Sequence, residues 1–257
     1  MLILIAESKT MAPCNAAVPP ESVPERLPAL DRQAAELMRT LAELHPVNLA
    51  KMVKISLPMA VRLHAMIYDF PNKTTGAEAI DAYTGVVFRA FDHASLTPAA
   101  AARAKRDLRI VSSLYGLLRT DDIIKPYRLD FSTAAAPGGA TLARYLRPEV
   151  TELLSHAVAE GAHSDILDLM PAEAAKAIDM KTIGTISRIW RVEFKEVVDG
   201  GALRTPSSNR LKTLRGMLLR DIMERDIATP HSLAELETDT FMPGGIQPDG
   251  RTILFYV

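Results

Sequence analysis

The chain has 257 residues, of which 48% are hydrophobic, so it is long enough to bury a continuous core in one large or two small domains. Its formal net charge of −1 excludes global steering toward nucleic acid or anionic membranes, so attraction for anions requires local clusters of cations. The apolar LILIA run at residues 2–6 is too short for a membrane span or a signal peptide. We therefore expect a cytoplasmic protein without a membrane partner.

Metal and disulfide chemistry are also unexpected. Cys14 is the only cysteine, so an intramolecular disulfide cannot form, and its proline-rich surroundings are typical of an unreactive thiol. The six histidines show no paired spacing of the kind that binds zinc. We predict that the protein has no metal site and needs no cofactor.

Hydrophobic patterning predicts that the first part of the chain is mostly helical. The LILIA run favours a buried opening strand, and the proline-rich segment 11–30 is typical of an extended surface loop. Asp31 is placed to cap an amphipathic helix that ends before Pro46. The elements expected next are a short helix near 48–54, a helix near 58–69, a strand or strand–turn at 83–91, and a helix at 97–107 begun by Thr97-Pro98.

The second part of the chain mixes short strands with helices. The pattern predicts a buried strand at 108–114, a short helix or loop at 120–129, and a helix at 140–159 that is bent or restarted at Pro148. It then predicts a strand at 164–169, a short helix at 171–178, a strand at 181–190, a hairpin at 191–205, an amphipathic helix at 208–225 and a closing strand within 248–257. Because no repeat or linker interrupts this order, we predict one α+β domain over residues 1–257 with mixed strand pairing.

Lys9 and Thr10 directly follow the predicted opening strand. Loops at the ends of buried strands favour function because the strand fixes their position. A lysine beside a hydroxyl can bind phosphate or carboxylate, and a desolvated lysine can act as a base. A solvated loop lysine is the alternative, and this segment alone favours neither interpretation.

A second segment places tyrosines and cations around a glycine. Gly116 predicts a tight turn beside Tyr115 and Arg119, and exposed amides at such a turn can contact phosphates, as in helix–hairpin–helix elements. Two more cations and a second phenol follow: Lys125, Arg128 and Tyr127. The alternative is a solvated surface with both tyrosines in the core. We favour a functional role because these side chains flank a turn instead of lining a helix face.

A third segment lies in the predicted helix at 208–225. Ser208, Lys212 and Arg215 are spaced i, i+4 and i+7 and share one face, and Gly216 permits close approach of backbone or ligand. A basic helix face is usually only solvated, so this segment by itself favours the structural interpretation. If the three segments meet in space, they form one electropositive site.

Together these segments resemble the YaaA family, the peroxide stress resistance proteins. The MLILI start with Lys9-Thr10 is similar to that family's MLILISPAKT. The stretch LRIVSSLYGLLRTDDIIKPYRLDF resembles its L-R-x-L-S-G-L-Y-G-x-L-R-P-x-D…P-Y-R-L signature, and LKTLRGMLLR is similar to its A-K-x-A-R-G-x-M-x-R helix. The resemblance covers nearly the whole chain. At 168–174 the chain departs from the family's N-L-A-S-x-E-Y segment and keeps only Leu169 and Glu173.

The resemblance implies a compact α+β fold with a helix–hairpin–helix-like element and a positively charged cleft. It also implies binding to duplex or distorted DNA and protection from hydrogen peroxide. The residues that match the family's motifs, and are therefore expected around the cleft, are Lys9, Thr10, Tyr115, Gly116, Arg119, Tyr127, Arg128, Lys212, Arg215 and Gly216.

Two functions remain open from the sequence. The first is a non-enzymatic DNA-binding protein whose phosphate contacts come from Arg119, Arg128, Lys212 and Arg215. The second is an enzyme that uses the same cleft on a small anionic nucleotide, nucleoside or amino-acid-like metabolite. In the enzyme, Arg128 and Arg215 would clamp the anion. Its acid–base candidates are Lys9, Tyr115, Tyr127 and the carboxylates of Glu7, Asp168 and Glu173.

Overall fold

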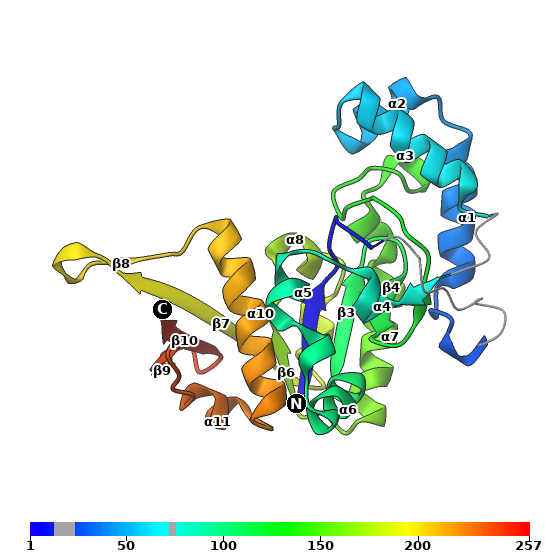
Figure 1. Cartoon of the computed structure of the whole chain (residues 1–257). Coiled ribbons are helices and arrows are strands. Elements are labelled where there is room, and N and C mark those ends of the chain that lie inside the picture. The colour runs from blue at the N-terminus through cyan, green and yellow to red at the C-terminus, as the bar shows by residue number, and fades with distance from the viewer. Residues whose placement is uncertain (13–23, 72–75) are drawn as a thin grey trace.

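The computed structural model describes residues 1–12, 24–71 and 76–257, and it contains a mixed eight-stranded sheet (Figure 1). The strand order is β4-β3-β1-β6-β7-β10-β9, and β8 pairs with β7. The strands are β1 (Leu2–Ala6), β3 (Leu108–Ser112), β4 (Gly116–Arg119), β6 (Asp165–Asp168), β7 (Arg188–Val197), β8 (Leu203–Arg204), β9 (Met242–Ile246) and β10 (Thr252–Tyr256). The expected mixed sheet is thereby confirmed.

The five strands from β3 to β10 run parallel, whereas β4, β8 and β9 are antiparallel to their neighbours. β1 lies between β3 and β6, with Ile3 opposite Leu108 and Leu4 opposite Asp168. The chain therefore leaves β1 toward one side of the sheet and later returns to add strands on the other side. The carboxyl edge at such a reversal is a favoured place for ligands in open α/β sheets.

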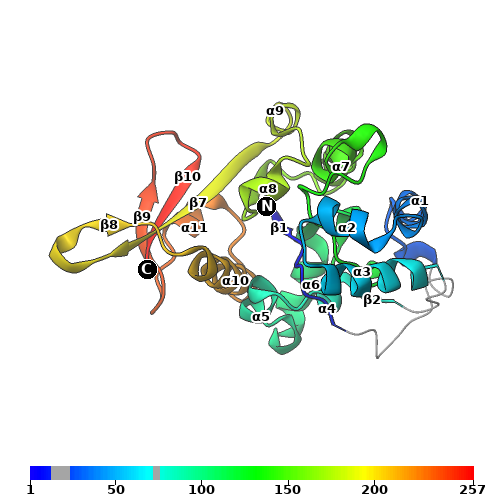
Figure 2. The same cartoon turned by 90° about the horizontal axis from the view of Figure 1, so that it is seen from above.

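Helices cover both faces of the sheet (Figure 2). The helices are α1 (Asp31–Ala42), α2 (Pro46–Val53), α3 (Leu57–Asp69), α4 (Ala79–Ala82), α5 (Val86–Phe91), α6 (Pro98–Asp107), α7 (Leu142–Glu160), α8 (Ala172–Ala175), α9 (Met180–Ile183), α10 (Ser208–Glu224) and α11 (Pro230–Ala234). Short 3-10 turns lie at Pro24–Arg26, His93–Ser95, Pro137–Gly139 and Asp199–Gly201, and β2 (Ala77–Glu78) pairs with β5 (Ile123–Ile124). The helical first part of the chain is confirmed for its described residues.

Successive side chains of β1 point to opposite faces of the sheet and pack in two separate cores. Ile3 and Ile5 pack in the cluster that contains the buried residues of α5, α6 and α10, whereas Leu2 and Leu4 pack with those of α7. All four side chains are at most 1% exposed. This two-sided burial explains why the LILIA run is uniformly apolar, as is typical of a parallel strand covered on both faces.

Several expected elements are confirmed, including the strands at β3, β6 and β10, the β7–β8 hairpin, and helix α10. Helix α7 runs through Pro148 as one element. Several predictions were wrong: Asp31 is the first residue of α1, whose N-cap is Leu30, and β5 lies within 120–129, where a short helix or loop was expected. Most of the segment 83–91 forms helix α5 (Val86–Phe91), because Phe88 and Phe91, one turn apart, both bury against the core that includes α10. Residues 180–183 form helix α9 because the Asp179 carboxylate caps it, and β7 begins only at Arg188.

The segment around Gly116 is a β-hairpin. Ser113, Leu114 and Tyr115 connect β3 to β4, and Ser112 lies opposite Gly116 in the ladder. Gly116 has φ of +73°, and a Cβ there would lie 2.6 Å from Leu30 Cδ1. The turn therefore joins two strands instead of the two helices of a helix–hairpin–helix element, because residues 117 and 118 continue the apolar sheet.

Gly216 lets helices α10 and α5 approach closely. A Cβ at this position would lie 2.3 Å from the Val87 carbonyl oxygen and 3.0 Å from the Phe91 amide nitrogen. We expect Gly216→Ala to lower the free energy of unfolding by about 1–3 kcal/mol, because overpacking against backbone outweighs the better helix propensity of alanine. Urea unfolding followed by circular dichroism measures this, and Thr213→Ala in the same helix serves as the near-neutral control. Equal stability of Gly216→Ala and wild type would contradict the prediction.

Among the described residues, none of the helices is both long enough and apolar enough to span a lipid bilayer.

Candidate functional site

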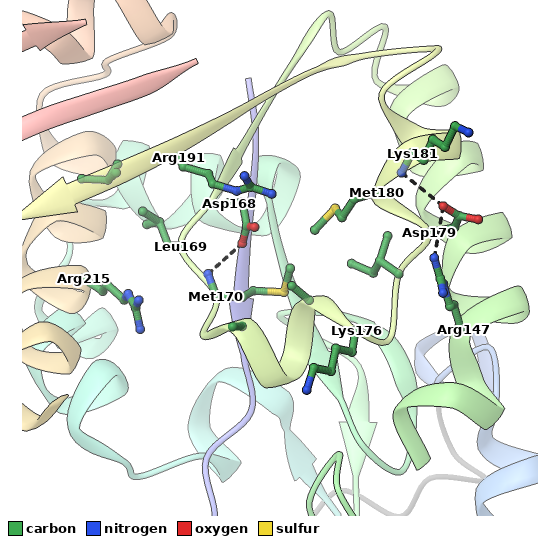
Figure 3. A pocket seen from close by; sticks show the side chains of 14 residues that line it. Arg147, Asp168, Leu169, Met170, Lys176, Asp179, Met180, Lys181, Arg191 and Arg215 are labelled. Atoms are coloured by element: carbon green, nitrogen blue, oxygen red, sulfur yellow. Dashed lines mark hydrogen bonds and ion pairs between the residues drawn. The ribbon is translucent and has the colours of Figure 1, made fainter. Parts of the chain in front are cut away.

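A pocket of about 590 Å³ opens at the carboxyl end of β6, beside β7 and the carboxyl-side loop that carries α8 and α9 (Figure 3). Its charged lining comprises five cations, Arg147, Lys176, Lys181, Arg191 and Arg215, and two carboxylates, Asp168 and Asp179. Its apolar lining includes Leu169, Met170, Ile178, Met180 and Val192. We call this the cationic pocket. Its volume is in the range typical of small-molecule sites.

Secondary structure fixes the inner charges of the cationic pocket. Asp168 is the last residue of β6, and Arg191 lies directly opposite it in β7. Arg215 comes from the middle of α10, and Figure 3 shows it extending toward the loop that carries Met170. Neither arginine forms an ion pair or side-chain hydrogen bond among the described residues. Both guanidinium groups are therefore available to an anion.

Asp168 forms the base of the cationic pocket. The side chain is buried, and its Oδ1 accepts the Met170 amide hydrogen bond at 2.9 Å. Burial raises the pKa of the Asp168 carboxyl, although the Met170 amide and the charges of Arg191 and Arg215 act in the opposite direction. Burial also lowers the pKa of the half-buried Arg215 guanidinium, which the Asp168 charge partly offsets. Both groups thus lie where charge is poorly solvated.

The outer wall of the cationic pocket has one internal ion pair. Arg147 Nη2 in α7 lies 3.3 Å from Asp179 Oδ1, and Asp179 also accepts the amide hydrogen bonds of Lys181 and Thr182. These amides and Arg147 lower the pKa of the Asp179 carboxyl, which keeps it ionised and holds α9 in place. Lys176 and Lys181 form no side-chain hydrogen bond or ion pair among the described residues, so both add positive charge to the opening.

A second polar cluster lies beyond the end of β1. Glu7 Oε2 accepts the Ser113 amide at 2.8 Å and the Tyr127 hydroxyl. The Tyr127 oxygen also lies 2.7 Å from both the Tyr83 hydroxyl and the Ser112 hydroxyl. Since Tyr127 donates its one proton to Glu7, Tyr83 and Ser112 must both donate to Tyr127. Every proton in the network is thus directed toward the Glu7 carboxylate.

Burial dominates the titration of this cluster. It raises the pKa of Glu7 to about 7, although hydrogen bonds from Ser113 and Tyr127 act in the opposite direction. It also raises the pKa values of Tyr83 and Tyr127 well above the ordinary value, and the nearby Glu7 charge adds to this. Glu7 can therefore exchange a proton near neutral pH.

Comparison with known proteins decides the family. The family model described as "Peroxide stress protein YaaA" matches residues 1–243. The chain belongs to the YaaA family. It is 30% identical over 245 residues to a UPF0246 protein of Shewanella pealeana, an alignment that covers 93% of this chain and 91% of that protein. A UPF0246 protein of Hahella chejuensis is 29% identical over 261 residues, covering 99% of this chain and 98% of that protein.

Of the residues expected around the cleft from the YaaA family motifs, only Arg215 lines the cationic pocket. Lys9 is exposed and pairs with Asp130 at 2.9 Å, while the Thr10 hydroxyl lies 3.0 Å from that of Ser8. Tyr127 belongs to the Glu7 cluster. The three YaaA segments thus lie after β1, around the β3–β4 turn and within α10, and they do not together line the cationic pocket.

The turn amides expected to bind phosphate already have partners. The Leu114 and Tyr115 amides donate to Ser112 Oγ at 3.1 and 2.9 Å, and the Ser113 amide donates to Glu7. The Tyr115 side chain is fully buried, and its hydroxyl accepts the Lys125 amide at 3.1 Å. This part of the prediction was wrong, because the short turn folds its donors inward onto a serine and a glutamate.

Arg119 is held by the protein itself. Its Nε lies 2.8 Å from Asp122 Oδ1, and its Nη2 donates to the Glu25 carbonyl at 2.7 Å. The adjacent carboxylates of Asp121 and Asp122 therefore pair with the Arg119 guanidinium group, which the sequence assigned to a ligand. Asp122 is buried, which raises the pKa of its carboxyl despite the Arg119 contacts.

The remaining predicted site residues lie at the surface or part-way to it. Ser208, Lys212 and Glu173 are exposed, whereas Arg128 is half-buried, and none of the four lines the cationic pocket. Their functional roles stay predictions. Four cations of the pocket were not predicted from the sequence: Arg147, Lys176, Lys181 and Arg191. The sequence did contain a signal for Arg191, because this residue follows a predicted strand and adjoins the carboxyl edge at which Asp168 lies.

Among the described residues, no group of three or more His, Cys, Asp or Glu side chains is arranged to hold a metal ion. Cys14 lies outside the described residues.

Proposed function

We propose that this YaaA family member is a cytoplasmic DNA-binding protein of the peroxide stress response, and that it contacts DNA phosphates through the cationic pocket. One observation carries the proposal. Five cations and two carboxylates line the pocket, although the chain as a whole carries a net charge of −1. Such local excess of positive charge favours phosphate without requiring a basic protein.

The cations that contact DNA phosphates differ from those that the sequence predicted. Arg191 and Arg215 are the phosphate ligands nearest Asp168, because neither forms an ion pair with a carboxylate among the described residues. Lys176 and Lys181 extend the positive surface at the opening, and the exposed Lys212 continues it along α10. Arg119 makes no phosphate contact, since Asp122 already binds its guanidinium.

A salt series tests this proposal. The affinity for duplex DNA, measured by fluorescence anisotropy, should fall linearly on a log–log plot with salt. Arg215→Gln should weaken binding and reduce the slope by about 0.9, because one phosphate contact is lost. Arg204→Gln is the matched control: it removes one positive charge from β8, whose arginine pairs with Glu196 at 2.7 Å. Absent binding at low salt, or equal effects of the two substitutions, would refute the assignment.

The Glu7 cluster favours a second candidate, an enzyme acting on a small anionic substrate. Burial raises the pKa of Glu7 to about 7, which suits a general acid or base at neutral pH. Lys9, two residues further on, would anchor the anion. Tyr115 is less suitable than expected because its hydroxyl is buried against the Lys125 amide, and Glu173 is exposed on α8.

A further inference from the structure

We propose that the cationic pocket is a nucleotide site, in which Arg191 and Arg215 bind a phosphate and the open oxygen of Asp168 accepts a hydrogen bond from the sugar or base. The inference rests on the proposed function only in that both use this pocket. It differs in ligand, since phosphate binding alone requires no carboxylate.

Asp168 limits what can enter the pocket. Its Oδ1 is taken by the Met170 amide at 2.9 Å. Its Oδ2 has no partner among the described residues and is not sealed in the interior, so it faces the pocket as an acceptor. A carboxylate between two arginines repels a second anion placed directly on it. The ligand must therefore present a hydroxyl or amino group to Asp168 and its negative charge elsewhere.

The two arginines fix where that negative charge lies. Arg191 and Asp168 are direct neighbours across the β6–β7 ladder, and Arg215 reaches the same base from α10 (Figure 3). Both guanidinium groups influence the Asp168 carboxyl electrostatically, yet neither comes within ion-pair distance of it. We place the phosphate between the guanidinium groups, where it can accept charge-assisted hydrogen bonds from both.

The rest of the lining suits a flat organic body. Met170, Ile178, Met180 and Val192 supply apolar surface between the charged groups. Methionine adapts its shape and packs well against aromatic rings. An inorganic phosphate would leave this surface bare, whereas a base would cover it. A phosphate, a hydroxyl or amino donor and a planar ring occur together in a nucleotide.

The ligand chemistry has two sources, a free mononucleotide or one unpaired nucleotide of a DNA strand. Binding of deoxyadenosine monophosphate, inorganic phosphate, fully paired duplex and duplex with one unpaired adenosine is measured by calorimetry on the full chain. We expect the mononucleotide to bind more tightly than inorganic phosphate. Preference for the duplex with the unpaired adenosine over the paired duplex identifies DNA as the source, and equal binding of the two identifies the free nucleotide.

Asp168→Asn is the deciding variant. Asparagine keeps the oxygen that accepts the Met170 amide and replaces the open acceptor with a donor. Nucleotide affinity should fall by about 10- to 100-fold, as for loss of a hydrogen bond to a charged group. Affinity for inorganic phosphate should be unchanged or rise, because a negative charge has been removed. Arg215→Gln should weaken both ligands, and Arg204→Gln neither.

A loss of nucleotide affinity in Asp168→Asn, with phosphate affinity unchanged or raised, supports the site. Parallel responses, or nucleotide binding no tighter than that of phosphate, overturn it. Paired-duplex binding that survives Asp168→Asn while nucleotide binding is absent overturns this inference alone and leaves the proposed DNA-binding function standing. If the wild type binds the nucleotide but not the paired duplex, the proposed DNA-binding function is overturned and this inference stands.

Discussion

Replacing Arg103 by methionine should lower the free energy of unfolding by about 3–5 kcal/mol, the largest loss that we expect from one substitution. Arg103 is 4% exposed and joins α6 to the end of α10. Its guanidinium donates to the carbonyls of Ile222, at 2.6 Å, and Ile227, and it lies 3.4 Å from the buried Asp107 carboxylate. Methionine fills similar volume but leaves these buried acceptors with fewer donors.

Arg106→Met is the matched control for Arg103→Met. Arg106 belongs to the same helix and binds the same carboxylate, with its Nη2 2.8 Å from Asp107 Oδ2, but its side chain is largely exposed. An exposed ion pair contributes only about 0–1 kcal/mol. Urea unfolding of the two variants should therefore differ clearly. Similar losses would mean that the buried position of Arg103 is unimportant.

Glu7→Gln should stabilise the protein at alkaline pH. In the folded protein burial raises the pKa of Glu7 from 4.5 to about 7, so the folded state holds a proton that the unfolded state releases between these values. The contribution of Glu7 to stability is complete below pH 4.5 and is lost as pH rises through about 7. Glutamine resembles the protonated form at every pH and avoids this loss.

The expected gain is zero near pH 4 and on the order of 3 kcal/mol above pH 8, which follows from about 1.4 kcal/mol per pKa unit. Urea unfolding across this pH range measures it, with the exposed Glu173→Gln as the control that should not change the pH dependence. A constant difference between Glu7→Gln and wild type would contradict the shifted pKa. The same variant separates the two candidate functions, because it abolishes proton transfer at Glu7 and leaves the phosphate contacts of the cationic pocket intact.

Local patterns predicted most elements because each depends on neighbouring residues. The apolar LILIA run specifies a strand buried on both faces, and the spacing of Leu214, Leu218 and Ile222 specifies the buried stripe of α10. Local pattern gave the wrong element for the segment 83–91. Its valines and phenylalanines favour a strand by composition, but packing of Phe88 and Phe91 against the core decided for a helix.

The candidate site was only partly predictable, because its contacts join residues distant in sequence. The sequence identified Asp168, Arg215, Glu7 and Tyr127 as chemically capable. It contained no signal that Glu7 binds Tyr127, or that Arg191 lies opposite Asp168. Arg119 was assigned to a ligand for a related reason. Its partner Asp122 is close in sequence, but only the turn that follows β4 brings the two groups together.

The position of β1 at the centre of the sheet has a consequence for how the chain folds. Ile3 pairs with Leu108, and Leu2 with Ile166, so one edge of the strand stays unpaired until β3 is made and the other until β6 is made. Loop closure over such distances is slow, and parallel sheets with non-local pairing fold on millisecond-to-second timescales. Until then the apolar LILIA segment is an open template for aggregation. We expect refolding yields to depend on protein concentration, and a molecular chaperone to raise them.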